Sequence, residues 1–323
     1  MKALRLGTRR SKLAMAQSGG VAEKVRALTG RPVELVEITT YGDVSREQLT
    51  QIGGTGVFVS ALRDALQAGE IDFAVHSLKD LPTAQPPELA LAAVPVREDP
   101  RDALVARDGL TFEQLAVCDR VRVGTGAPRR MAQLNAWARA LGCEITTVPI
   151  RGNVDTRIGY VRDGELDAVV LATAGLRRIG RDSEITETLP SDAVLPAPGQ
   201  GALAIECAAS DADLTALLAG LDDPHTRIAV TAERTLLSTL EAGCSAPVAA
   251  LADLREEGRN ATVMRLRGAV GTTDGTSLVQ LSTTGSVAAS VEEALSHAAT
   301  MGRELAEEML AKGAAGLMGE RAL

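Results

Sequence analysis

The sequence predicts an α/β protein with two lobes joined by two crossovers, followed by a small α+β domain. Strand-like segments are repeatedly followed by a loop and a helix, which is typical of α/β sheets. A later strand at 202–207 follows the turn-rich segment Pro196–Gly201, and we expect it to rejoin the first lobe. From about Asp222 the pattern changes to three alternating strands and a long helix, which predicts a small α+β domain.

Composition and charge restrict the class of protein. The chain has 323 residues, a 45% hydrophobic fraction and a formal charge of −8. Phosphate binding needs a basic field, so nucleic acid is not expected as a partner. Three histidines, and four cysteines without CxxC spacing, predict no metal site. No long apolar run follows Met1 and none reaches about 18 residues, so we expect a cytoplasmic protein without a signal peptide or membrane span.

The first lobe is predicted at residues 1–96 and 200–220. Its expected elements are a strand at 3–6, helices at 12–28 and up to about 69, and strands at 33–39, 71–75, 89–94 and 202–207. Ser11 is expected to cap the first helix and Gly30 to end it. The glycine-rich loop at 51–58 lacks a GK[ST] ending, so it is no P-loop, and we interpret it as a flexible lid.

The second lobe is predicted at residues 97–199, and it begins in a charged crossover, Arg97–Asp102. Its expected elements are strands at 122–123, 145–150 and 168–171, and a helix from Pro128 to about 141. The C-terminal domain is predicted at residues 221–323. We expect helices at 224–240 and 291–311, strands at 248–254, 262–270 and 277–283, and a turn near Asp274.

The stretch His76–Pro82 is the centre of the predicted site. It follows an apolar strand, and open α/β sheets bind ligands outside the carboxyl ends of their strands. Asp80 is the first candidate, because a carboxylate there can transfer a proton or face a developing cation. The alternative is a solvated turn in which Lys79 and Asp80 are surface charges. We interpret His76 as structural.

Arginine pairs recur after strands or at helix starts. Four loops carry them: Arg9 with Arg10, Arg129 with Arg130, Arg151 with Arg157, and Arg177 with Arg178. One such loop is also explained by a capped helix with solvated arginines. Four of them in an acidic protein indicate a cleft that binds several carboxylates or phosphates.

Cys244 lies in a Gly-Cys-Ser-Ala-Pro loop, where a thiol stays accessible and can attach a substrate or cofactor. By residue type alone, Cys118 and Cys143 could serve as well. Cys207 ends an apolar strand and is expected to be buried. For any one cysteine the alternative is an inert packing residue.

Nine motifs occur along the chain in an order known from one enzyme family. They are GTRRSKLA, GGTGVF, HSLKDLP, REDPRD, GTGAPRR, RGNVDTR, AGLRRIG, PAPGQGA and EAGCSAP. From residue 4 to about 250, and more loosely to its end, the chain resembles porphobilinogen deaminases (hydroxymethylbilane synthases). The resemblance implies two periplasmic-binding-protein-like lobes, a double crossover and a small third domain with a three-stranded antiparallel sheet. It also implies a monomeric transferase of tetrapyrrole and haem biosynthesis, whose substrate is the small molecule porphobilinogen.

The resemblance implies a role for individual residues. Cys244 would carry a dipyrromethane cofactor through a thioether bond. Asp80 would hydrogen-bond pyrrole N–H groups, stabilise the cation that deamination leaves and shuttle protons. Lys79 would pair with a cofactor carboxylate. The other implied cofactor-binding residues are Ser11, Arg129, Arg130 and Arg157, and the implied substrate-binding residues are Arg9, Arg151, Arg178, Thr125 and Gln200.

The chain departs from the family pattern in two loops. Gln51 and Thr55 stand where many relatives carry lysine, and Gly126-Ala127 replaces a serine pair, so those carboxylate contacts are not carried over. Two other classes stay open at this point. A non-catalytic anion receptor would explain the lobes and arginines but not Cys244. A dinucleotide-dependent oxidoreductase is disfavoured because Arg129 occupies the third glycine position of the G-x-G-x-x-G fingerprint.

Overall fold

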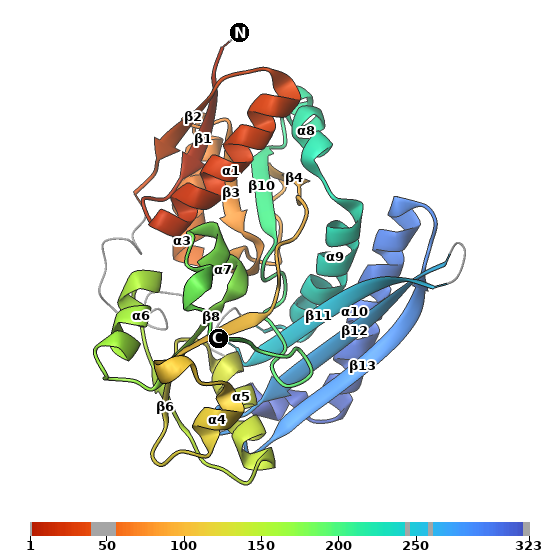
Figure 1. The fold of residues 1–323 in the computed structure, drawn as a ribbon. Coiled ribbons are helices and arrows are strands. Elements are labelled where there is room, and N and C mark those ends of the chain that lie inside the picture. Colours follow the sequence, from red (N-terminus) through yellow and green to blue (C-terminus); the bar gives the residue numbers. More distant parts are fainter. Residues whose placement is uncertain (1, 40–55, 243–245, 258–260, 319–323) are drawn as a thin grey trace. The chain divides into compact units, whose positions relative to one another are not determined.

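The computed structural model describes residues 2–39, 56–242, 246–257 and 261–318 (Figure 1). Contacts divide the chain into unit 1, Met1–Glu98 with Gly201–Arg227, and unit 2, Asp99–Gln200 with Ile228–Leu323. Each unit therefore combines segments that are distant in the sequence. The division into three domains, at 1–96 with 200–220, 97–199 and 221–323, stays a prediction.

Unit 1 holds a five-stranded mixed sheet in the order β2-β1-β3-β10-β4. β1 (Leu4–Thr8) pairs in parallel with β2 (Val33–Glu37) and with β3 (Phe73–Ser77). β10 (Leu203–Ala208) runs antiparallel between β3 and β4 (Leu89–Ala93). The late strand therefore rejoins the first sheet, as predicted.

Helices cover both faces of this sheet. Successive side chains of a strand point to opposite faces, so neighbouring residues of β3 pack against different helices. Phe73 and Val75 pack in the cluster that includes residues of α1 (Lys12–Thr29) and α8 (Ala212–Leu218). Ala74 packs in the other cluster, with residues of α3 (Gly56–Gln67).

Both predicted caps of α1 are confirmed. Ser11 Oγ accepts a hydrogen bond from the backbone N–H of Ala14 at 3.2 Å. Gly30 takes the left-handed conformation, with φ of 65°, and its N–H donates to the Arg26 carbonyl. A residue without a Cβ adopts this conformation without steric cost, which is why the helix ends there.

Unit 2 contains a second mixed sheet with the equivalent order, β7-β6-β8-β5-β9. β6 (Arg122–Thr125) pairs in parallel with β7 (Thr146–Pro149) and β8 (Ala168–Ala172). β5 (Asp102–Ala106) runs antiparallel between β8 and β9 (Glu187–Thr188). The antiparallel strand of each sheet follows, along the chain, the edge strand of the other sheet. The chain therefore crosses between the sheets twice, from β4 to β5 and from β9 to β10. The predicted double crossover is confirmed.

The sequence does not predict β5, because its first residue, Asp102, lies in the charged stretch that predicts a crossover. All of Asp102–Ala106 is buried. A carboxylate can begin a buried strand only where cations neutralise it, and that condition depends on residues far away in the sequence. Between β5 and β9 the chain forms the helices α4 (Phe112–Ala116), α5 (Pro128–Ala140), α6 (Val154–Arg162) and α7 (Thr173–Arg178).

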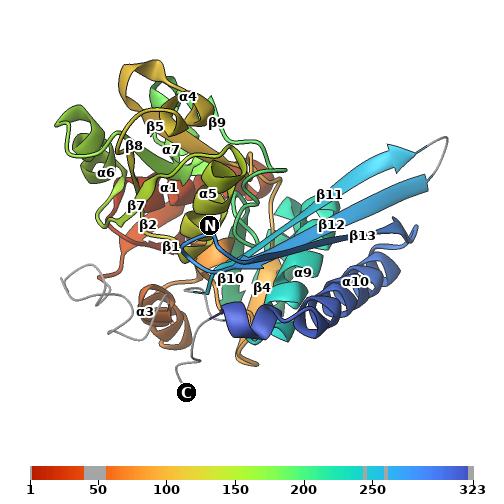
Figure 2. The same cartoon turned by 90° about the horizontal axis from the view of Figure 1, so that it is seen from below.

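The C-terminal part of unit 2 is a three-stranded antiparallel sheet, β11 (Val248–Glu257), β12 (Ala261–Gly271) and β13 (Leu278–Val287). Residues of α9 (Pro224–Thr239) and α10 (Val291–Ala311) pack on one face of it (Figure 2). The other face packs on Leu195. The three strands are longer than predicted, mainly at the end of β11 and at the end of β13. Among the described residues, no helix combines the length and apolarity that crossing a bilayer requires.

Candidate active site

The predicted catalytic residues follow β3 directly. The strand passes into one turn of 3-10 helix, η1 (Leu78–Asp80). Leu78 and Leu81 are 0% and 1% exposed and anchor this turn from both sides. Lys79 and Asp80 lie between them and are half-buried. β3 ends at Ser77, two residues later than expected, so Lys79 and Asp80 are the charged residues beyond its carboxyl end.

Arg9 and Ser11 belong to the same edge of the unit 1 sheet. β1 and β3 are parallel neighbours, so the loops after their carboxyl ends lie at one edge, which is where such sheets bind ligands. A hydrogen bond of 3.0 Å from Gln17 Nε2 to Ser77 Oγ ties α1 to the end of β3. Ser11 Oγ accepts the helix-capping bond described above. Ser77 belongs to the predicted stretch His76–Pro82, whereas Gln17 stands out in the sequence neither by type nor by spacing.

The arginines of unit 2 follow the carboxyl ends of parallel strands in the same way. β7, β6 and β8 are parallel neighbours. The loop after β6 leads to Arg129 and Arg130, the loop after β7 carries Arg151, and α7 after β8 carries Arg178. Arg151 is exposed and Arg178 is half-buried. The fold therefore brings these three loops to one edge of the sheet, whereas a single cleft lined by all four arginine loops stays a prediction.

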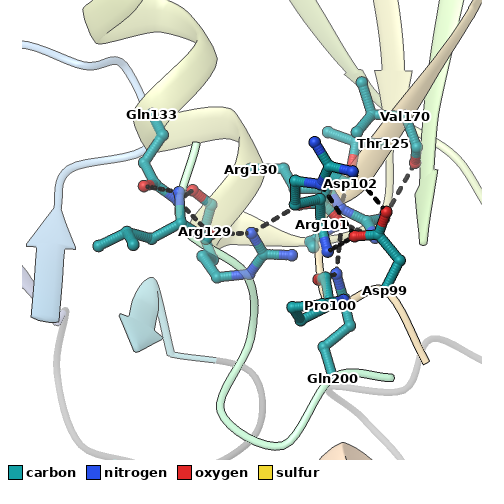
Figure 3. A network of polar contacts seen from close by, with 12 residues as sticks. Asp99, Pro100, Arg101, Asp102, Thr125, Arg129, Arg130, Gln133, Val170 and Gln200 are labelled. Atoms are coloured by element: carbon teal, nitrogen blue, oxygen red, sulfur yellow. Dashed lines mark hydrogen bonds and ion pairs between the residues drawn. The ribbon is translucent and has the colours of Figure 1, made fainter. Parts of the chain in front are cut away.

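Asp102 lies at the centre of a buried network of polar contacts in unit 2 (Figure 3). Its carboxylate lies 2.8 Å from Arg129 Nη1 and 2.7 Å from Arg130 Nη2, and it accepts a 2.8 Å hydrogen bond from Gln200 Nε2. Asp102 is 0% exposed. Burial alone would raise the pKa of Asp102, but Arg129 and Arg130 outweigh it and hold the pKa well below its usual range.

Three of the predicted ligand-binding residues are thus engaged inside the protein. Arg129 also donates to the carbonyl of Leu195, and Gln200 donates to that of Pro100 at 2.7 Å. Arg130 Nη1 donates to the carbonyl of Val170 at 2.9 Å, whereas its buried Nε has no hydrogen-bond partner among the described residues. The roles of Arg129, Arg130 and Gln200 as direct ligands stay predictions, and the structure gives each an internal partner as well.

Thr125 is buried at the end of β6. It is 0% exposed, and its Oγ1 accepts a 3.3 Å hydrogen bond from the N–H of Ala127. A Cβ on Gly126 would lie 2.7 Å from the carbonyl oxygen of Ile150, so a larger residue here would require the backbone to shift. The role of Thr125 in substrate binding stays a prediction.

Arg157 lies in a cationic cluster. Its Nε donates to the carbonyl of Gly152 at 2.8 Å. Burial lowers the pKa of Arg157, and the nearby charges of Arg130 and Arg151 lower it further. Three guanidinium groups that repel one another are stabilised by an anion, and arginine matches carboxylates in a bidentate geometry. The role of Arg157 in carboxylate binding stays a prediction, which this clustering of positive charge supports.

Two family models match the chain. "Porphobilinogen deaminase, dipyromethane cofactor binding domain" covers residues 4–216, and "Porphobilinogen deaminase, C-terminal domain" covers residues 227–311. The chain belongs to the porphobilinogen deaminase family. Porphobilinogen deaminase 1 of Streptomyces avermitilis is 75% identical over 99% of this chain and 98% of that protein. The Streptomyces coelicolor protein of the same name is 72% identical over 99% of both, and the Thermobifida fusca porphobilinogen deaminase is 56% identical over 96% and 94%.

The match to a porphobilinogen deaminase also gives the chain a dipyrromethane cofactor-binding domain at residues 4–216. The cationic cluster at Arg157 fits such a cofactor, since each pyrrole unit carries carboxylates. The predicted attachment residue, Cys244, and the departures Gln51 and Thr55 lie outside the described residues. Within the described ranges, no cluster of His, Cys, Asp and Glu could hold a metal ion.

The other three cysteines occupy packed positions. Cys207 is buried, as predicted, and burial raises the pKa of its thiol. Cys118 and Cys143 are half-buried, and their thiols donate to the carbonyl groups of Gln114 and Leu141. A thiolate nucleophile needs an accessible site that favours the charged form, which Cys207 lacks.

Solved structures of binding proteins share a partial likeness with the chain. The periplasmic aliphatic sulphonate binding protein SsuA from Escherichia coli is 14% identical, with a TM-score of 0.38 over 75% of this chain and 71% of that chain. The probable amino-acid ABC transporter extracellular-binding protein ytmK from Bacillus subtilis gives a TM-score of 0.40 at 12% identity, over 68% and 90%. The fold class rests on the sheet orders described above.

Proposed function

We propose that the chain is an active porphobilinogen deaminase, that is, a hydroxymethylbilane synthase of tetrapyrrole and haem biosynthesis. This transferase would condense four porphobilinogen molecules head to tail on a covalently attached dipyrromethane primer, with loss of ammonia at each step. Hydrolysis would then release the linear tetrapyrrole hydroxymethylbilane. The main support is the match of both family models, which together span residues 4–216 and 227–311.

Asp80 stabilises the positive charge of the reaction intermediate in this proposal. Loss of ammonia leaves a cationic methylenepyrrolenine derived from the substrate, which the free α-carbon of the growing chain attacks. The Asp80 carboxylate stabilises this cation, hydrogen-bonds pyrrole N–H groups and carries protons between steps. One carboxylate–cation contact at 4 Å contributes about 4 kcal/mol at an effective dielectric of 20. Asp80 is half-buried beside Leu78 and Leu81, which restricts its access to solvent.

Cys244 and Lys79 hold the primer. The Cys244 thiol forms the thioether, and Lys79 pairs with a primer carboxylate. When bound, dipyrromethane supplies the α-carbon to which the first substrate is joined. The remaining primer ligands in this proposal are Ser11, Arg129, Arg130 and Arg157.

Arginines bind the carboxylates of the substrate and of the lengthening chain. Arg157 has the clearest support, because its charge is repelled by Arg130 and Arg151. Each charge-assisted hydrogen bond contributes about 1.5–3 kcal/mol. The other substrate-binding residues in this proposal are Arg9, Arg151, Arg178, Thr125 and Gln200. We further propose a cytoplasmic monomer whose partner is porphobilinogen, with no part for nucleic acid or membrane.

The direct test is turnover of porphobilinogen by the purified protein. We expect release of ammonia and formation of hydroxymethylbilane in the wild type. Asp80→Asn should fold and keep its cofactor mass but lose kcat by about a hundredfold or more, which corresponds to about 3 kcal/mol. Binding of porphobilinogen without release of ammonia would instead favour the anion-receptor class and contradict the proposal. Near-normal turnover in Asp80→Asn would remove Asp80 from its role.

A further inference from the structure

His76 and Glu206 form a buried side-chain contact just before the turn that carries Asp80. They lie on adjacent strands and on the same face of the unit 1 sheet, where Ala74 is paired with Glu206 and His76 with Ala204. Their side chains are 4% and 0% exposed. His76 Nε2 lies 3.3 Å from Glu206 Oε2, without the alignment of a hydrogen bond. The imidazole and the carboxylate are therefore in direct contact inside unit 1.

Glu206 also binds α3 and the loop before β4. Arg63 of α3 donates from Nε to Glu206 Oε2 at 3.1 Å and from Nη2 to Oε1 at 2.8 Å. Gln85 Nε2 donates to Oε1 at 3.1 Å. Burial raises the pKa of Glu206, but His76 and Arg63 outweigh it and lower the pKa from 4.5 to about 2. Glu206 is therefore an anion to which α3, β3 and the loop at Gln85 are all attached.

The position of the pair connects it to the reaction. His76 is four residues before Asp80, and the N–H of Leu78 in between donates to the carbonyl of Ala202 at 3.0 Å. β10, which carries Glu206, thus fixes the end of β3 both through its backbone and through the His76 side chain. A catalytic group must be held within about 0.5 Å of its working position, and a displacement of 1 Å can reduce the rate about a hundredfold.

We propose that Glu206 is a positioning residue, which acts through His76 to fix the turn that carries Lys79 and Asp80. This inference rests on the proposed function for its kinetic consequence. The proposed reaction gives no role to Glu206 or Arg63, and this inference gives Glu206 one. Arg63 stabilises the same carboxylate from α3, whereas the contact with His76 transmits the position of β10 to the turn.

The test compares three variants of the full-length holoenzyme. Glu206→Gln keeps the shape of the side chain but removes its charge. Arg63→Met leaves the His76–Glu206 contact in place. Asp72→Asn is the matched control, since Asp72 precedes β3 at its other end and pairs there with Arg5 Nη2 at 2.7 Å. We expect kcat to fall 10-fold to 100-fold in Glu206→Gln, with KM changed less than threefold, and to stay within threefold of wild type in the other two.

A second readout does not depend on activity. Hydrogen–deuterium exchange of the peptide 76–82 should be at least tenfold faster in Glu206→Gln than in wild type, and unchanged in Asp72→Asn. The double variant Arg63→Met/Glu206→Gln removes the unpaired buried cation, so its Tm should recover above that of Glu206→Gln while kcat stays low.

Three results would overturn the inference: normal kcat and exchange in Glu206→Gln, recovery of kcat together with Tm in the double variant, or an equal loss of kcat in Arg63→Met. Failure of the wild type to release ammonia from porphobilinogen would contradict the proposed function instead. The exchange measurement would still decide the positioning role in that case.

Discussion

Arg130 and Asp102 form a buried ion pair, with Arg130 Nη2 2.7 Å from Asp102 Oδ1. Asp102 is the first residue of β5, where the chain enters the second sheet, and Arg130 lies in the first turn of α5. The pair therefore joins the crossover to the loop that presents the arginines. Because Arg129 shares the same carboxylate, two cations depend on a single anion.

Loss of that anion should destabilise the fold severely. Asp102→Asn leaves Arg129 and Arg130 buried without a counterion, and breaking a buried pair costs about 3–5 kcal/mol. Urea denaturation measures the change in the free energy of unfolding. Asp108→Asn is the control, because Asp108 pairs with Arg107 at the surface, where such a pair contributes about 0–1 kcal/mol. Equal effects of the two substitutions would show that the Asp102 network does not support the fold.

Arg157 and Arg129 should respond differently to the same substitution. Arg157→Met removes a charge that is repelled by Arg130 and Arg151, so the Tm should stay the same or rise while KM for porphobilinogen increases about tenfold or more. Arg129→Met leaves Asp102 with one fewer partner, so the Tm should fall. Thermal unfolding together with steady-state kinetics separates the two effects. A lower Tm and an unchanged KM in Arg157→Met would assign Arg157 a structural role.

Stability should depend on pH through Glu206. The folded pKa, about 2, is below the unfolded value of 4.5, so the stabilisation is present above pH 4.5 and is lost as the pH falls towards 2. At about 1.4 kcal/mol for each pKa unit, the loss is of the order of 3 kcal/mol. Other carboxylates titrate in the same range, so the measured quantity is the difference between wild type and Glu206→Gln. That difference should shrink from pH 5 to pH 2, and a constant difference would contradict the assignment.

The sequence predicts most of the fold because its local signals are strong. Ser11 and Gly30 mark both ends of α1, and Pro128 lies at the start of α5, as helix capping rules require. The closing helix, Val291–Ala311, has the predicted bounds. The ends of these helices are determined by residues close to them in the chain, so the local sequence is sufficient to predict them.

Long-range pairing explains what the sequence could not show. Asp102 is a charged residue in a charged stretch, and only the folded chain brings Arg129, Arg130 and Gln200 to its carboxylate. Glu206 sits in an apolar strand, where its partners Arg63 and His76 come from segments 143 and 130 residues away. The predicted arginines of unit 2 follow neighbouring strands of one sheet, but the internal partner that Arg129 and Arg130 share is a distant acid.

The most direct test of the central claim is the intact mass of the purified wild-type protein beside Cys244→Ser. Cys118→Ser is the control, since it removes another thiol that is not expected to carry the cofactor. The wild type and Cys118→Ser should both exceed the mass of the bare chain by two linked pyrrole units, and Cys244→Ser should have only the mass of its chain and no activity. A wild-type protein that turns over porphobilinogen with the mass of the bare chain, or an excess mass that persists in Cys244→Ser, would contradict the account.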